Sequence, residues 1–140
     1  MKTIVIAGAQ SNIGKTAVAK KICSLLPNSI FIKLGKGNPD KIKNDIFYNV
    51  GTSVDILFED HNDKDWLIIE SNQILKEFQP DCVVYLTGDN PKPSAQMARE
   101  KADIIRGRKI EPETINKLAE HLCMTKEIIY QIAKYSGALL

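Results

Sequence analysis

An eight-residue segment that directly follows a short apolar run constrains the fold of this chain most strongly. The run, Thr3 to Ala7, predicts a β-strand, and Ala9-Gln10-Ser11-Asn12-Ile13-Gly14-Lys15-Thr16 comes after it. From Lys15 onward, apolar residues recur at the spacing of an amphipathic helix. A strand that passes through a tight loop into a helix directs backbone N–H groups and the helix N-terminus at one point, which favours a bound di- or triphosphate. The pattern therefore predicts a phosphate-binding loop, or P-loop.

Each part of this loop has a predicted role. Lys15 is expected to reach the β- and γ-phosphates, and the Thr16 hydroxyl to ligate Mg²⁺. Ala9 stands where the first glycine of the pattern is usual, and Gly8 just before it can supply an unusual backbone angle. The alternative is a chance match in a glycine-containing turn, but the strand before the loop and the helix after it favour nucleotide binding. The predicted nucleotide-binding residues of the loop are Gln10, Ser11, Asn12, Ile13, Gly14, Lys15, Thr16 and Ala17.

Composition limits what else the chain can be. A chain of 140 residues is long enough for one domain with a substantial core. A net charge of +2 with 26% charged residues makes nucleic acid an unlikely partner, and no apolar run approaches membrane-spanning length. Because Met1-Lys2 leads directly into a strand, we expect no signal peptide and a cytoplasmic location. Three scattered cysteines and two isolated histidines predict neither a zinc site nor a disulfide framework.

Apolar runs alternate with helical patterns along the chain, which is typical of a parallel sheet covered on both faces. We therefore predict a three-layer α/β fold of the P-loop NTPase type, with a mainly parallel sheet of about five strands. The expected strands are Thr3 to Ala7, Ser29 to Leu34, Trp66 to Glu70, Asp81 to Leu86 and Asp103 to Arg106. The expected helices are Lys15 to Leu26, Val54 to Asp60, Asn72 to Phe78 and Ser94 to Lys101. The region Gly35 to Gly51 reads as a mobile loop before an uncertain segment at Ile46 to Val50.

Ligands of such sheets bind at the carboxyl ends of the strands, so the residues there are candidates. Glu70 ends an apolar strand, where a carboxylate is costly without a cation nearby, and we assign it with Thr16 to Mg²⁺. The alternative is a carboxylate favoured by the dipole of a following helix. Lys33, with Lys36 and Asn38 after it, is expected to meet the terminal phosphate or an anionic substrate, unless these residues only solvate a loop. Glu70 and Asp40 are candidates for a general base.

The ends of the fourth and fifth predicted strands are candidates for holding the nucleotide base. Arg108 is expected to stack on the ring, and Asp89 or Asn90 to read its edge, with Arg108 and Asn90 included in the nucleotide-binding set. The alternative is two turns with polar side chains. The asparagine-lysine-x-aspartate signature of guanine recognition is absent, so Mg²⁺ with either ATP or GTP fits the sequence.

Two families share these motifs. The segment Ile6 to Thr16, the third-strand Ile68-Ile69-Glu70-Ser71-Asn72 and the Pro80-Asp81 before the fourth strand resemble the MobB family, small P-loop proteins of molybdopterin-guanine dinucleotide biosynthesis. A second resemblance is to dethiobiotin synthetase and related amidoligases, whose loop ends similarly and whose second strand ends in a lysine, as Lys33 does. The resemblance covers about residues 1 to 109. The first implies a GTP-binding adaptor that acts with a cofactor-biosynthesis protein, and the second an ATP-dependent small-molecule ligase or kinase.

Residues 110 to 140 are predicted to form a helical hairpin packed on the nucleotide-binding core of residues 1 to 109. Leu118, Leu122, Thr125, Ile129 and Ile132 also follow the spacing of a helix-turn-helix, which makes a nucleotide-regulated DNA-binding protein the alternative. The stretch from Arg108 onward is nearly balanced in charge, which argues against DNA because DNA affinity is largely phosphate neutralisation.

The sequence as a whole predicts a domain that binds Mg²⁺ and a nucleoside triphosphate and hydrolyses it or transfers its γ-phosphoryl group. Lys15, Glu70 and Lys33 are the expected catalytic residues, with Lys15 and the loop amides neutralising charge on the phosphates. The competing interpretation is a binding module that loads nucleotide and acts on a partner protein. A homodimer is an open option for a single domain of this length.

Overall fold

The computed structural model describes residues 1–36 and 45–140 and contains a six-stranded sheet in the order β3-β2-β4-β1-β5-β6. Every strand pairs in parallel with its neighbours. The strands are β1 (Lys2–Gly8), β2 (Ser29–Gly35), β3 (Ile46–Asn49), β4 (Trp66–Glu70), β5 (Cys82–Leu86) and β6 (Ile104–Ile105). The helices are α1 (Lys15–Leu25), α2 (Val54–Asp60), η2 (Gln73–Lys76, a 3₁₀-helix), α3 (Ala95–Glu100), α4 (Pro112–Leu122) and α5 (Lys126–Ser136).

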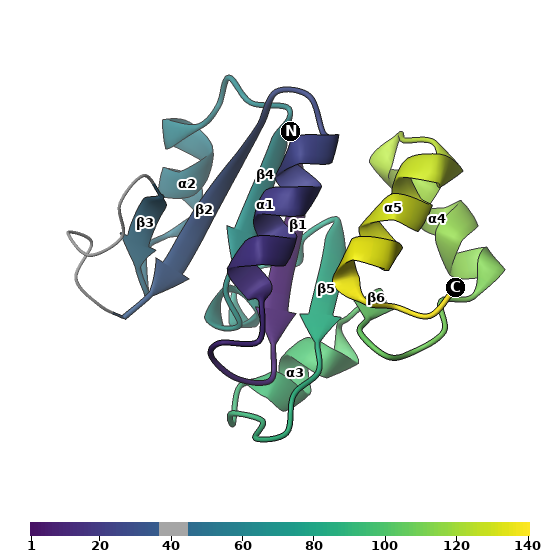
Figure 1. The fold of residues 1–140 in the computed structure, drawn as a ribbon. Coiled ribbons are helices and arrows are strands. Elements are labelled where there is room, and N and C mark those ends of the chain that lie inside the picture. The colour runs from purple at the N-terminus through teal and green to yellow at the C-terminus, as the bar shows by residue number, and fades with distance from the viewer. Residues whose placement is uncertain (37–44) are drawn as a thin grey trace.

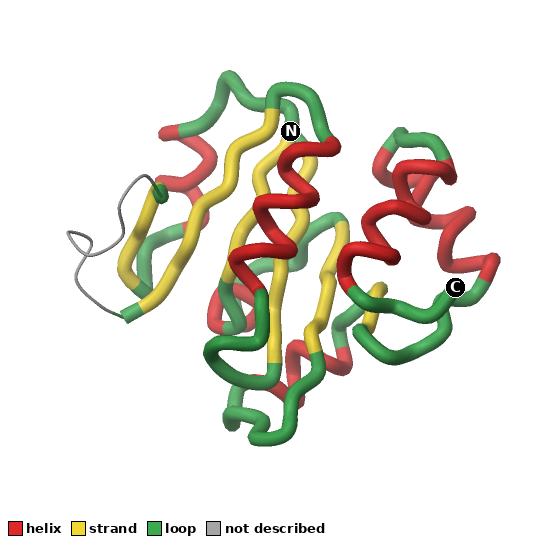
Figure 2. Tube along the Cα trace, viewed as in Figure 1, coloured by secondary structure: helices red, strands yellow, loops and turns green. Residues whose placement is uncertain are grey.

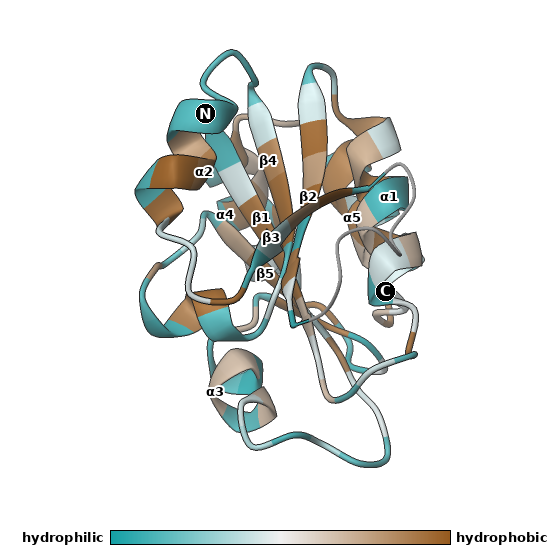
Figure 3. Cartoon of the chain, turned by 90° about the vertical axis from the view of Figure 1, so that its left-hand side faces the viewer, coloured by the Kyte–Doolittle hydropathy of each residue, from teal (hydrophilic) through white to brown (hydrophobic). Residues whose placement is uncertain are grey.

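Both faces of the sheet are covered, which gives three layers (Figure 1). Successive strand residues point to opposite faces, so a strand buried on both sides must be apolar throughout. On one face Ile4 and Ile6 of β1 pack with α1, α4 and α5, and on the other Val5 and Ala7 pack with α2, η2 and α3. Hydrophobic segments accordingly colour much of β2 and β4 in Figure 3. The predicted three-layer α/β fold with a parallel sheet is confirmed.

Two details of the predicted architecture are wrong. The sheet has six strands rather than about five, because Ile46–Asn49, predicted only as an uncertain segment, pairs with β2 at the sheet edge. Its apolar run, Ile46-Phe47-Tyr48, is only three residues long and is exposed or half-buried at the sheet edge, so the sequence marks this strand less clearly than the others. The predicted helix from Asn72 to Phe78 is the shorter 3₁₀-helix η2. The Asn72 side chain is hydrogen-bonded to β1, and buried Pro80 precedes the next strand, which leaves room for little more than one turn.

The C-terminal residues form the predicted pair of helices, which lie beside β6 in Figure 2. Ile115, Leu118 and Leu122 of α4 and Ile129 and Ile132 of α5 are buried in the same hydrophobic cluster as α1. The residues with helix-turn-helix spacing therefore attach the hairpin to the sheet. No helix in the part of the chain that the structure describes is long and apolar enough to cross a membrane.

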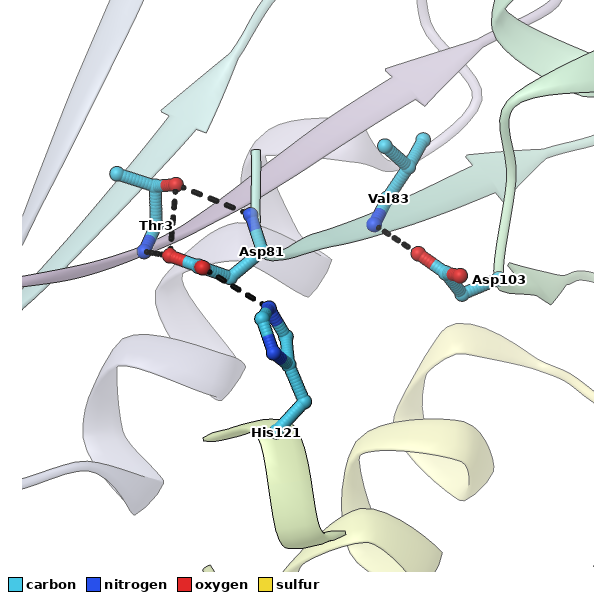
Figure 4. Close-up of polar contacts among 5 residues, drawn as sticks. All are labelled: Thr3, Asp81, Val83, Asp103 and His121. Atoms are coloured by element: carbon cyan, nitrogen blue, oxygen red, sulfur yellow. Dashed lines mark hydrogen bonds and ion pairs between the residues drawn. The ribbon is translucent and has the colours of Figure 1, made fainter. Parts of the chain in front are cut away.

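A polar network ties the hairpin to the amino ends of the strands (Figure 4). The Asp81 carboxylate accepts hydrogen bonds from the backbone N–H and hydroxyl of Thr3, and it contacts Nε2 of His121 on α4 at 3.0 Å. Asp103 accepts a hydrogen bond from the Val83 N–H at 2.8 Å. Burial raises the pKa of the Asp103 carboxyl, although the Val83 hydrogen bond acts in the opposite direction. The Asp81 contacts hold α4 beside β1 and the start of β5, and the Asp103 contact joins the segment before β6 to β5.

The turn between α4 and α5 generates a stability prediction. Cys123 ends α4 with φ 54°, a left-handed conformation that costs an L-residue free energy and that glycine adopts freely. The side chain is exposed, so its removal costs little packing. Cys123→Gly is expected to raise the free energy of unfolding by about 0.5 to 1 kcal/mol in urea denaturation.

Cys123→Ala is the matched control, because it removes the thiol but keeps the Cβ that is disfavoured at positive φ. It is expected to give no gain. Equal stabilisation by both variants would show that the thiol, and not the backbone angle, is responsible.

Candidate functional site

The candidate site lies in a crevice between the carboxyl ends of β1 and β4. The chain leaves β1 for α1 on one face of the sheet and leaves β4 for η2 on the other, as the two hydrophobic clusters show. Connections that diverge in this way open a crevice at the carboxyl ends of the strands, where α/β proteins bind ligands. A cleft of about 1210 Å³ occupies this position. It is lined by Ser11, Asn12, Gly14, Lys15, Thr16, Ala17, Lys20, Lys33, Leu34, Gly35, Lys36, Val50, Glu70, Ser71, Asn72, Gln73, Lys92 and Ser94.

The β1–α1 loop, residues 9–14, forms one wall of the cleft and has the geometry of an anion-binding turn. Asn12 and Gly14 adopt positive φ angles of 61° and 96°, and Gly14 is the N-cap of α1. Gly8 allows the loop to fold back on β1, because a Cβ there would lie 2.8 Å from the Cδ1 of Ile13 and 2.9 Å from the Cδ of Lys15. Within the described residues, no backbone hydrogen bond is donated by the N–H of Asn12 or Gly14. The loop thus presents backbone donors without partners beside a helix N-terminus.

Side-chain hydrogen bonds tie this loop and the Gly8 end of β1 to two neighbouring connections. The Asn72 amide accepts from the N–H of Gly8 at 2.9 Å, donates to the carbonyl of Gly8 at 2.8 Å, and donates to Ser94 at 3.2 Å. The Gln10 side chain accepts from the backbone N–H of Asn90 at 2.6 Å. A loop held on both sides keeps its shape before a ligand arrives, which lowers the cost of binding.

Lys92 is a further link between the connection after β5 and the loop. Its backbone N–H donates to the carbonyl of Ala9 at 2.7 Å, and its ammonium group donates to the hydroxyl of Ser11 at 3.1 Å. The Lys92 side chain lines the cleft and brings a positive charge to its rim.

Glu70, Thr16 and Lys33 meet at the centre of the cleft. Glu70 ends β4, and the parallel register places Lys33 of β2 directly beside it. The Thr16 hydroxyl donates to Oε1 of Glu70 at 2.5 Å, and the Lys33 ammonium lies 3.2 Å from Oε2. The Glu70 side chain is only 5% exposed, whereas that of Lys33 is 34% exposed. Lys33 therefore supplies the cation that a buried carboxylate at this position requires, and it remains open to the cleft.

Lys15 lies at the start of α1 in the same cleft. Burial lowers the pKa of its amine, the neighbouring Glu70 carboxylate raises it, and the charges of Lys92 and Lys33 lower it further. The cleft lining contains five lysines, Lys15, Lys20, Lys33, Lys36 and Lys92, and one carboxylate, Glu70, which leaves an excess of positive charge there. The electrostatics of the cleft therefore favour an anion.

The donor set fits a hard divalent cation. Mg²⁺ binds to oxygen, keeps several waters and takes one or two protein ligands together with substrate phosphates. The Thr16 hydroxyl and the Glu70 carboxylate supply two oxygens beside the loop, which matches that partial set. Among the described residues there is no cluster of three or more His, Cys, Asp or Glu side chains suited to hold a metal by themselves.

Most residues predicted from the loop motif and the strand ends come together here. Ser11, Asn12, Gly14, Lys15, Thr16 and Ala17 line the cleft with Lys33, Lys36 and Glu70, while Gln10 and Ile13 belong to the same loop. Asn90 contacts the loop through its backbone, outside the cleft lining. Arg108 is exposed in the connection after β6 and also lies outside the lining. Asn38 and Asp40 lie outside the described residues.

Three residues at the site had no predicted role. Asn72 follows Glu70 at the end of a buried strand, and that position was a usable signal. Lys92 lies in a proline-containing turn, and its contact with Ser11 joins residues 81 positions apart, which no local pattern reveals. Arg106 donates to the carbonyl of Ile13 at 2.8 Å and was predicted only as the end of a strand.

Comparison of the chain with protein-family models, with curated proteins and with solved structures found no match.

The contact between Lys33 and Glu70 generates a stability prediction. Lys33→Met removes the cation from a buried carboxylate and is expected to lower the free energy of unfolding by about 2 kcal/mol in urea denaturation. Adding Glu70→Gln to that variant is expected to recover at least half of the loss, since the uncompensated charge is then gone.

Lys20→Met is the control, because Lys20 forms an ion pair of similar length, 3.0 Å with Asp45, but is 56% exposed. Its expected cost is below about 0.5 kcal/mol. Equal losses in Lys33→Met and Lys20→Met would show that burial of Glu70 does not set the energy of the pair.

Proposed function

We propose that this protein binds a nucleoside triphosphate with Mg²⁺ in the cleft between β1 and β4 and hydrolyses it or transfers its γ-phosphoryl group. The observation that supports this most directly is the convergence of Lys15, Thr16 and Glu70 beside the β1–α1 loop, whose backbone donors have no partners within the described residues. This combination of a lysine, a hydroxyl, a carboxylate and free amides is what a P-loop uses to hold a polyphosphate and its metal.

Each residue has a defined role in the proposal. The β1–α1 loop amides and the Lys15 ammonium group bind the phosphate oxygens and neutralise their charge. Thr16 and Glu70 would hold Mg²⁺, which would supply positive charge to offset the negative charge of the phosphates during transfer. Lys33 faces the cleft from β2, on the side of Glu70 away from β1, where the terminal phosphate or an anionic acceptor would be neutralised.

The shape of the cleft supports room for more than the nucleotide phosphates. It extends from the β1–α1 loop past Glu70 to the end of β2, where Lys33, Leu34, Gly35 and Lys36 line it with Val50. A volume of about 1210 Å³ exceeds the roughly 300–1,000 Å³ of usual ligand pockets. This favours transfer to a small anionic acceptor, as in an ATP-dependent ligase or kinase of the dethiobiotin synthetase type. The alternative is a GTP-binding adaptor of the MobB type that acts with a cofactor-biosynthesis protein.

The C-terminal hairpin offers less support for DNA binding. Ile129, Ile132, Ala133 and Ser136 of α5 are buried against the rest of the protein. Its exposed residues include Glu127 as well as Lys126 and Lys134, so this helix does not present a strongly basic surface. Retention of DNA at moderate salt would revive this alternative.

The experiment that tests the proposal is calorimetric titration of the protein with ATP and with GTP, each with and without Mg²⁺, followed by phosphate release on the tighter ligand. Tight GTP binding with negligible turnover favours the adaptor. ATP preference favours the ligase or kinase and directs a screen of small carboxylates. Absence of binding by both nucleotides contradicts the proposal.

Lys15→Ala is expected to weaken nucleotide binding at least about 100-fold, because it removes the one positively charged side chain of the segment Ala9 to Thr16. The fold should persist, since Lys15 is only half-buried and its pKa shows that burial disfavours its charge. Calorimetry measures the affinity, and circular dichroism checks the fold.

Lys134→Ala on the exposed side of α5 is the matched control and should leave affinity unchanged. If Lys15→Ala bound nucleotide as well as the unmodified protein, the assignment of the β1–α1 loop would be wrong.

Glu70→Gln tests the metal role. The variant keeps a side chain of the same size but loses the charge, so nucleotide binding should persist while about tenfold more Mg²⁺ is needed for the same effect. Titrations of nucleotide at a series of Mg²⁺ concentrations measure this shift.

Glu59→Gln, on an exposed position of α2, is the control for the loss of one negative charge. An unchanged Mg²⁺ response in Glu70→Gln would identify Glu70 as a structural acid that serves only Lys33 and Thr16.

A further inference from the structure

Arg106 follows the edge strand β6, and its side chain reaches the β1–α1 loop. Its Nη1 donates to the carbonyl oxygen of Ile13 at 2.8 Å. Its Nη2 lies 3.6 Å from the position that a Cβ on Gly14 would occupy. Within the described part of the chain, no ion pair involves Arg106. The guanidinium is therefore directed to a loop carbonyl and to no carboxylate.

The contact has a geometric consequence for the next residue. The peptide bond between Ile13 and Gly14 is trans, so its C=O and N–H point in opposite directions. Arg106 and Ile13 both lie outside the cleft lining, whereas Gly14 belongs to it. A carbonyl turned toward Arg106 therefore turns the Gly14 N–H away from Arg106, and this N–H donates no hydrogen bond within the described residues. Gly14 has φ 96° and no side chain, so the residue itself does little to fix the orientation of the Ile13–Gly14 peptide. The hydrogen bond from Arg106 is the firmer restraint.

Arg106 is itself held from two sides. Its backbone N–H donates to the carbonyl of Tyr85 at 2.9 Å, and its carbonyl accepts from the hydroxyl of Thr87 at 3.2 Å. Its stem crosses Gly137, the C-cap of α5, where a Cβ would lie 3.0 Å from the Cγ of Arg106. The next residue, Gly107, donates to the carbonyl of Gly137 at 2.8 Å. The side chain that orients the Ile13–Gly14 peptide is thus fixed by the sheet and by the end of the hairpin.

We propose that Arg106 is a positioning residue of the nucleotide site, which holds the Ile13 carbonyl outward so that the Gly14 N–H is presented to the phosphates. This inference rests on the proposed function. Preorganised donors bind an anion without the cost of reorienting the loop, so loss of the restraint weakens binding although Arg106 does not touch the ligand. The guanidinium acts by orienting the Ile13 carbonyl, since its planar donor group holds that carbonyl through a short hydrogen bond.

A structural role alone would give a different result, since Arg106 also joins the hairpin to the sheet. The two roles separate when affinity and stability are measured on the same variants. Ile115→Ala removes buried packing from α4 and lowers stability, yet leaves the β1–α1 loop untouched. Lys109→Met removes a nearby exposed positive charge and preserves the Ile13 contact.

The experiment measures the affinity of Mg·ATP and Mg·GTP by calorimetry for the unmodified protein, Arg106→Met, Arg106→Lys, Ile115→Ala and Lys109→Met. Urea denaturation of the same samples gives their stabilities. Arg106→Met is expected to bind the tighter nucleotide about tenfold more weakly, and Arg106→Lys to fall between it and the unmodified protein. Ile115→Ala and Lys109→Met are expected to keep full affinity. Because short-range orientation is little screened, the tenfold ratio should persist at 0.5 M salt, on the order of three times physiological ionic strength.

Each outcome decides a separate question. Equal affinity of Arg106→Met and the unmodified protein overturns the positioning role and leaves the proposed function intact. A loss that disappears at high salt, or that Lys109→Met reproduces, shows a general effect of charge and overturns it as well. If Arg106→Met does not fold, Arg106→Lys at low and high salt decides by the same criteria. Failure of the unmodified protein to bind either nucleotide overturns the proposed function and the inference with it.

Discussion

The buried carboxylate of Glu70 organises the edge of the sheet where β1, β2 and β4 end. It lies at the tip of a strand with neighbours on both sides and is almost inaccessible to solvent. A charge in that position is stable only with compensating partners, which are the Thr16 hydroxyl from α1 and the Lys33 ammonium from β2. Three elements far apart in the chain are thereby fixed relative to one another. The shape of the cleft, the orientation of α1 and the access of the Lys33 ammonium group to the cleft all depend on this arrangement.

A second level of restraint acts on the β1–α1 loop. Asn72 and Gln10 join it to the connections that follow β4 and β5, and Arg106 joins it to β6. Asn72 bonds to the backbone of Gly8, the Gln10 side chain to Asn90 and Arg106 to the carbonyl of Ile13. None of these bonds uses the N–H of Asn12 or Gly14, so both donors stay free within the described residues. Burial at the same time disfavours the charge of Lys15, and an incoming polyphosphate would relieve that cost. The site therefore combines fixed dipoles with positive charges that lack sufficient negative partners.

The hairpin of α4 and α5 connects to this site without lining it. Its apolar residues complete the core on the face that α1 covers, and His121 contacts Asp81 at the opposite edge of the sheet. Gly137 at its end lies against the stem of Arg106. The pair of helices thus contributes to the cleft indirectly, through the packing of α1 and through one arginine. Packing in the core is therefore enough to account for the residues of α4 and α5 that have the spacing of a DNA-binding motif.

The sequence by itself determined the three-layer arrangement of the fold and the position of the loop between β1 and α1. Continuous apolar runs such as Leu67-Ile68-Ile69 are fit for a strand buried on both faces, and the spacing around Gly14, Lys15 and Thr16 is local, so one-dimensional patterns reveal them. Only the tertiary structure decided which distant residues meet. The β2–β4 register set Lys33 beside Glu70, pairing with β2 made a strand of Ile46–Asn49, and chain topology brought Lys92 and Arg106 to the loop while leaving Arg108 outside the cleft. The physical reason is that hydrophobic periodicity reports burial along each element, whereas pairing across elements is chosen by the packing and charge compensation of the whole sheet.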